Sequence, residues 1–89
     1  MDNNQEAMTK EMFENAPLDR KVYKVFESGR ELASRQFLHC HIKLFALGDF
    51  YVEVFYVPAT NKIHKVDTLS LDEVLQIYQN QLDISGLLK

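Results

Sequence analysis

The chain has 89 residues and a formal net charge of −3, with 46% hydrophobic and 26% charged residues. This length predicts one domain, and the composition is typical of a globular protein and excludes a chain that is disordered throughout. The net charge argues against nucleic-acid binding, because contacts with phosphates need a concentrated basic surface.

Residues 1–16 are mostly polar and predict a flexible or partly helical N-terminal arm, which leaves residues 17–89 as a single small α+β domain. Met8 and Met12 are four apart, so one helical turn could lay both on a neighbouring element. Pro17 suits the first turn of a helix, where the missing N–H of proline costs nothing.

The segment from Leu18 to Leu47 decides the architecture. At about 100° per residue its apolar side chains fall on one stripe, and Gly48 stands where a glycine would end a helix. This pattern favours one long helix. The stripe consists of Val22, Val25, Phe26, Gly29, Leu32, Ala33, Phe37, Cys40, Leu44 and Leu47.

A strand is the alternative for residues 37–47, where apolar and polar side chains also alternate as in a strand. Gly48 and Asp49 would then form a two-residue hairpin turn. Gly29 fits both interpretations. Within a helix it permits close packing with a neighbouring element, and in the alternative it marks a break in the helix. The alternation consists of Leu38, Cys40, Ile42 and Leu44 against His39, His41 and Lys43.

The segment from Leu44 to Val57 has eleven apolar residues in fourteen, and its second part, Phe50 to Val57, predicts a strand that is apolar on both faces. A turn at residues 58–61 follows, with Asn61 suited to a left-handed conformation. Lys62 to Leu69 predicts the returning strand, which is partly exposed or carries a bulge because its apolar residues do not alternate.

Ser70 and Glu73 form a capping-box pattern, which predicts a helix from Leu71 to about Leu82. The apolar residues of the tail at 83–88 are expected to dock on the core. The sequence therefore predicts an α+β fold in α-β-β-α order (a long helix, a β-hairpin and a C-terminal helix), and the alternative is a three-stranded meander flanked by helices.

Chemistry-bearing residues are few. Cys40 has no partner for an intrachain disulfide, and the N-terminus does not read as a signal peptide, so we expect a cytoplasmic protein. His39, His41 and His64 could approach a metal ion only in the strand interpretation, and their spacing is not that of a zinc site. We expect no metal, no cofactor and no membrane partner.

Glu53 stands among apolar strand residues, where an unpaired carboxylate would be costly. Lys65 or Arg35 could pair with it, or it could be solvated. No second carboxylate, nucleophile with a base, or phosphate loop accompanies it. The sequence therefore predicts no catalytic residues and a protein that is not an enzyme.

The apolar side chains exceed what one hairpin and two helices can cover, and aromatic residues are concentrated at protein interfaces. We expect a non-catalytic module for protein interaction or homo-oligomerisation, such as a homodimer. A dimeric regulatory protein associated with nucleic acid and a ligand- or metal-binding domain are the alternatives. The candidate interface consists of Leu38, Ile42, Phe45, Tyr51, Glu53, Phe55 and Val57.

The segment from Arg35 to Tyr56, with its Leu-Phe-Ala-Leu-Gly-Asp-Phe-Tyr-Val-Glu-Val-Phe-Tyr core, resembles short uncharacterised proteins of Bacteroidetes. The similarity covers roughly residues 20–85. It implies a helix, two strands and a short C-terminal helix, and it implies no activity and no functional residues.

Overall fold

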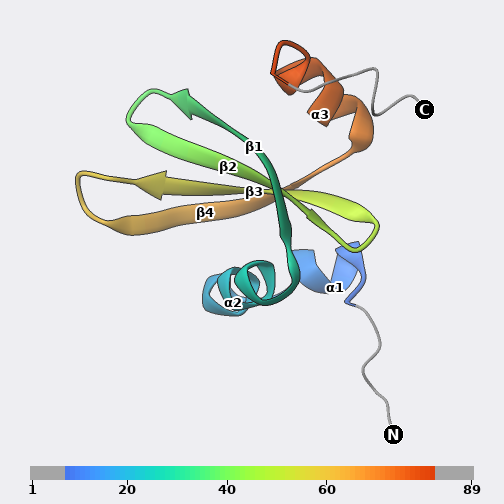
Figure 1. The fold of residues 1–89 in the computed structure, drawn as a ribbon. Coiled ribbons are helices and arrows are strands. Elements are labelled where there is room, and N and C mark those ends of the chain that lie inside the picture. Colours follow the sequence, from blue (N-terminus) through green and yellow to red (C-terminus); the bar gives the residue numbers. More distant parts are fainter. Residues whose placement is uncertain (1–7, 82–89) are drawn as a thin grey trace, which may run out of the picture.

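The computed structural model describes residues 8–81, which form an α+β fold with one antiparallel sheet (Figure 1). Two short helices precede four consecutive strands, and a third helix follows them. The elements are α1 (Lys10–Glu14), α2 (Leu18–Ser28), β1 (Arg30–Phe37), β2 (Cys40–Leu47), β3 (Phe50–Val57), β4 (Lys62–Leu69) and α3 (Leu71–Tyr78).

The sheet is a meander in which each strand pairs with the next, in the order β1-β2-β3-β4. Gly48 has a φ of 62° at the tight turn between β2 and β3, and Asn61 has a φ of 58° at the turn between β3 and β4. Both residue types tolerate this left-handed conformation, as the hairpin alternative and the Asn61 turn predicted. Leu38 occupies the same region with a φ of 56° at the turn between β1 and β2, where a leucine is strained.

The predicted long helix through residues 18–47 is wrong, and so is the α-β-β-α order. Its first part is α2, which ends at Gly29; the rest forms β1 and β2. Gly29 donates its N–H to the carbonyl of Val25 at 2.7 Å and then adopts an extended backbone with ψ of 153°. The three-stranded alternative, with a strand at residues 37–47, agrees with β2 at residues 40–47, but it missed β1 and is wrong in the number of strands.

Part of the predicted arm belongs to the folded core. Thr9 caps α1 by accepting a hydrogen bond from the N–H of Met12 at 3.1 Å. Phe13 of α1 is fully buried against Phe50, with ring centroids 5.6 Å apart. The last helix ends at Tyr78 and residues 79–81 form a turn, so the prediction that it runs to about Leu82 is wrong. Residues 1–7 and the predicted tail at 83–88 lie outside the described residues.

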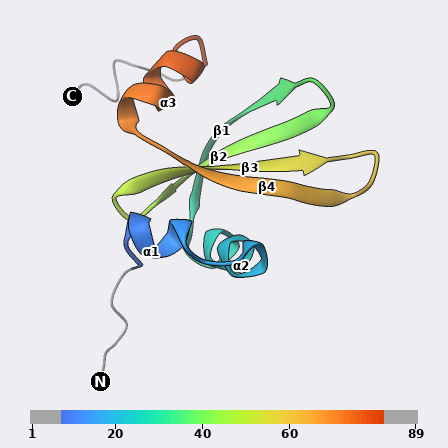
Figure 2. The same cartoon turned by 180° about the vertical axis from the view of Figure 1, so that it is seen from behind.

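The two faces of the sheet are covered by different helices (Figures 1 and 2). On one face, here called the α2 face, α1 and α2 pack against apolar residues of β2, β3 and β4. The buried cluster of this face consists of Phe13, Val25, Phe45, Leu47, Phe50, Val52, Val54 and Val66. Three of its members, Phe50, Val52 and Val54, alternate along β3 and therefore share one side of that strand.

The opposite face, here called the α3 face, holds a smaller cluster. It consists of Leu44, Leu69, Val74 and Tyr78, the last two from α3. The capping box predicted at the start of α3 is confirmed, because Ser70 Oγ accepts from the N–H of Glu73 at 3.2 Å and the Glu73 carboxylate accepts from the N–H of Ser70 at 2.8 Å.

Each edge strand, β1 and β4, contains a bulge that changes which of its residues lie on each face of the sheet. The register of β3 and β4 shifts so that Phe55 pairs with Lys65 and Tyr56 pairs with Ile63, which leaves His64 as the extra residue. Ile63 and Val66 thereby reach the same face although they are three residues apart. This confirms the bulge that the irregular pattern of this strand predicted.

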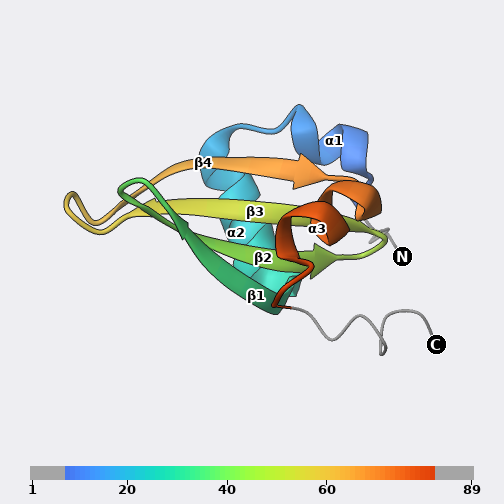
Figure 3. The same ribbon diagram turned by 90° about the horizontal axis from the view of Figure 1, so that it is seen from above.

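The hairpin ends of the sheet reach beyond the helices. The β1–β2 and β3–β4 turns lie at the same end of the sheet, away from α1, α2 and α3 (Figures 1 and 3). The half of the sheet that carries these two turns, here called the hairpin half, is thus less covered by helices than the other half. Within residues 8–81 no helix is long and apolar enough to cross a membrane.

Candidate functional site

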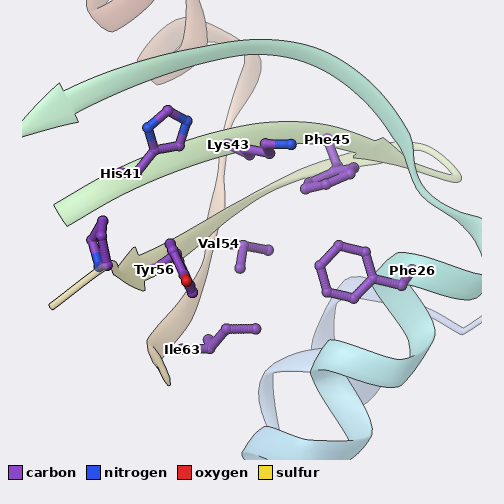
Figure 4. A pocket seen from close by; sticks show the side chains of 8 residues that line it. Phe26, His41, Lys43, Phe45, Val54, Tyr56 and Ile63 are labelled. Carbon is purple, nitrogen blue, oxygen red and sulfur yellow. The ribbon is translucent and has the colours of Figure 1, made fainter. Parts of the chain in front are cut away.

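An apolar groove lies on the α2 face, between α2 and the hairpin half of the sheet (Figure 4). It has a volume of about 420 Å³ and is open to solvent on one side. Residues from α2, β2, β3, β4 and the β3–β4 turn line it. They are Phe26, His41, Lys43, Phe45, Val54, Tyr56, Pro58 and Ile63.

The spacing of residues along the strands creates this groove. His41, Lys43 and Phe45 alternate along β2, so they share one face of the sheet. Lys43 pairs with Val54 and His41 pairs with Tyr56 on β3, which brings these four side chains to the same side. The groove therefore follows directly from the strand register.

An aromatic pair forms the end of the groove at α2. The ring of Phe26 meets the buried ring of Phe45 edge to face, with centroids 5.8 Å apart and planes at 90°. Phe26 nevertheless keeps 60% of its surface exposed. One of its ring faces is therefore available to a bound molecule.

The polar groups of the groove lie on its sheet side. The Lys43 ammonium is 3.5 Å from a carboxylate oxygen of Glu31 on β1, and both side chains are about half exposed. The Tyr56 hydroxyl donates a hydrogen bond to the side-chain oxygen of Asn61. Lys43 and His41 are thus the groups of the groove that can donate hydrogen bonds to a ligand.

A buried ionic cluster occupies the other face of the sheet. The carboxylate of Glu53 is 2% exposed and accepts hydrogen bonds from Arg35 Nε at 2.9 Å and from Arg35 Nη2 at 3.2 Å. The Tyr78 hydroxyl of α3 donates to the same carboxylate at 2.5 Å. Of the two partners considered for Glu53, the structure selects Arg35, although on a strand and not on a helix.

Burial and these contacts shift the pKa values of both partners of Glu53. Burial, followed by the hydrogen bond to Glu53, raises the pKa of Tyr78. The hydrogen bond to Glu53 outweighs burial and raises the pKa of Arg35. Tyr78 is therefore a neutral donor and Arg35 a cation, and the cluster ties α3 to β1 and β3.

The structure separates the residues of the candidate interface. Ile42 and Phe45 are buried, on opposite faces of the sheet, and Glu53 is held by Arg35. Leu38 lies at the β1–β2 turn with 80% of its surface exposed. The remaining three residues are half-buried on the α3 face of β3; they are Tyr51, Phe55 and Val57.

The three histidines do not gather. His39 is in the β1–β2 turn, His41 lines the groove and His64 is the exposed bulge residue of β4. Among residues 8–81 no group of three or more His, Cys, Asp or Glu side chains is placed to hold a metal ion. Of the three histidines, His41 is the one that lines the groove.

Sequence reasoning missed most of the groove. Among the residues that line the groove, the candidate interface includes only Phe45, and the histidines considered for a metal ion include only His41. In the strand interpretation His41 and Lys43 share one face, and this alternation was the sequence signal for the β2 wall of the groove. Phe26 could not be placed, because the long helix predicted a different path for the chain after residue 28.

Comparisons of the chain with protein-family models, with curated proteins and with solved structures gave no match. The similarity to short Bacteroidetes proteins therefore stays a prediction.

Proposed function

We propose that this protein is a small non-catalytic binding module whose binding site is the groove between α2 and the hairpin half of the sheet. The observation that carries the proposal is a groove of about 420 Å³ lined by six apolar or aromatic side chains, with Lys43 and His41 on one side. Small-molecule sites commonly have this combination of an apolar lining with a few polar groups, and volumes of roughly 300–1,000 Å³.

The packing around the groove supports a preformed site. Its base includes Val54 and Phe45, which are 4% and 5% exposed and belong to the buried cluster of the α2 face. A guest would therefore rest on side chains that are already fixed by the core. Binding to a preformed site requires little additional ordering of side chains, and this small free-energy cost favours affinity.

A neutral fluorescent probe tests the proposal. N-phenyl-1-naphthylamine should bind the wild type with increased fluorescence, and Ile63→Trp should weaken this binding at least tenfold by filling the groove. Ile77→Trp is the matched control, because Ile77 is 40% exposed on α3 on the other side of the sheet. Equal probe binding by both variants would show that the groove is not the site.

Self-association is the second candidate, and the β1–β2 turn favours it. Phe37, the last residue of β1, is 55% exposed, and Leu38 in the turn is 80% exposed; β1 is an edge strand of the sheet. An edge strand offers unpaired backbone groups, and an apolar turn beside it adds surface that a second copy can cover.

Sedimentation velocity between 5 and 500 μM tests this candidate. The wild type should shift from monomer to dimer, and Phe37→Lys should remain monomeric throughout. Tyr23→Lys provides the control, since Tyr23 is 65% exposed on α2 and away from the turn. A wild type that stays monomeric over the whole range would exclude this candidate.

A further inference from the structure

From the charges around the groove we infer that its ligand is a small amphipathic anion, a carboxylate with an unbranched or ring-shaped apolar body. This inference rests on the proposed function and adds the chemical class of the ligand. It follows from three features of the molecule: the distribution of acidic residues, the unused donors of Lys43, and the ratio of apolar to cationic groups in the groove.

Acidic residues are absent from the hairpin half of the sheet. None of the 13 Asp and Glu residues of the chain lies in residues 32–48 or 54–66. These ranges contain most of β1, all of β2, the second half of β3, the turn at residues 58–61 and the first part of β4. Of the basic side chains in these ranges, His41 and Lys43 line the groove, whereas Lys65 lies over Phe55 on the α3 face. A protein with net charge −3 thus has a local surface that suits an anion.

Lys43 can supply the direct contact. Its ammonium has three donors and makes one long contact with Glu31, at 3.5 Å, where both side chains are about half exposed. Two donors therefore remain for a ligand. His41 lies two residues away on the same face of β2, so its imidazole flanks the same position in the groove.

The apolar lining defines the rest of the ligand. Phe26, Phe45, Val54, Pro58 and Ile63 offer no charged group, so they match a hydrocarbon chain or ring. One ammonium balances one negative charge, whereas a phosphate dianion would need further cations at the same place. A monocarboxylate therefore fits the groove better than a phosphate ester does.

Calorimetric titration with decanoate and with 1-decanol tests the inference. Decanoate should bind the wild type about tenfold more tightly than 1-decanol, because a charge-assisted hydrogen bond is added to the same apolar contact. Lys43→Gln should remove most of this difference. Lys65→Gln is the matched control, since Lys65 is 48% exposed, also pairs with an acid, and lies over Phe55 on the α3 face.

A second variant predicts an effect of opposite sign. Glu31→Gln removes the carboxylate that competes for Lys43, so decanoate should bind about two- to threefold more tightly than to the wild type. Equal affinities for decanoate and 1-decanol, with no effect of Lys43→Gln, would overturn the anionic ligand and leave the binding module intact. Groove binding itself fails separately, if Ile63→Trp does not change the binding of the neutral naphthylamine probe.

Discussion

The guanidinium of Arg35 and the carboxylate of Glu53 form a two-point hydrogen-bonded ion pair across β1 and β3, although 18 residues separate them in the chain. The strand between them, β2, contributes Ile42 and Leu44 beside the pair, and both are fully buried. The side chain of Glu53 is 3% exposed and that of Arg35 is 22% exposed. A charge with so little access to water depends on its partner.

Removal of Arg35 should therefore cost more stability than removal of the whole cluster. Arg35→Ala leaves the Glu53 carboxylate buried and should lower the free energy of unfolding by about 2–3 kcal/mol, less than for a fully buried pair because Arg35 is partly solvated. The triple variant Arg35→Met, Glu53→Leu, Tyr78→Phe should lose less than Arg35→Ala alone. Urea denaturation measures the free energy of unfolding of both variants. A triple variant that loses more stability than Arg35→Ala would contradict this coupling.

Tyr78 should resist ionisation until the protein unfolds. Its pKa is raised in the folded state, so the stability it contributes is complete below about pH 10, the usual pKa of tyrosine, and is lost as the pH rises toward the folded value. Absorbance at 295 nm should show a late tyrosinate phase coincident with unfolding. Tyr78→Phe should remove that phase. Ionisation of Tyr78 before unfolding would contradict its role as a buried donor.

Leu38 should be a position where substitution stabilises the protein. Its left-handed φ of 56° costs an L-residue with a Cβ roughly 1 kcal/mol, and its side chain is 80% exposed, so it contributes little packing. Leu38→Asn and Leu38→Gly should raise the free energy of unfolding by about 0.5–1 kcal/mol. Leu38→Ala keeps the strain and should stay near the wild type. A loss in both Asn and Gly variants would mean that Leu38 has a packing role.

Gly29 should tolerate no side chain. A Cβ there would lie 2.6 Å from the carbonyl oxygen of Val25 and 3.3 Å from a ring carbon of Phe45. Gly29→Ala should therefore cost about 2 kcal/mol and disturb the groove wall at Phe45. Gly48→Ala is the comparison, because its Cβ would meet nothing within 4 Å and only its φ of 62° is unfavourable, for about 1 kcal/mol. Equal losses would indicate that the contact at Gly29 relaxes freely.

The C-terminal half of the fold could be predicted because its signals are local. The strand at Phe50–Val57, the turn with Asn61, the strand at Lys62–Leu69 and the helix start at Ser70 all agree with the structure. Each depends on residues within a few positions of one another: a β-branched and aromatic run, a left-handed asparagine and a capping box.

The segment after Gly29 could not be predicted in the same way. Its apolar residues fit a helical stripe and a strand alternation at once, so periodicity did not decide between them. Leu38, Ile42 and Phe45 fall on the side of the expected helix opposite its apolar stripe, so that helix would be apolar nearly all round. This feature was the sign of a strand. Strands buried on both faces have this pattern, and here Ile42 faces α3 while Phe45 faces α2.

The sequence by itself determined the α+β class, the β3–β4 hairpin and the capped last helix, since short-range propensity and turn chemistry specify these elements. Only the tertiary structure decided that residues 30–47 are two strands, because the pairing of β1 with β2 and of β2 with β3 satisfies their backbone groups. That pairing also brought Arg35 to Glu53, and the fold places Phe26 and Lys43 in the lining of one groove. The groove and the buried ion pair are therefore consequences of contacts between residues that are distant in the chain.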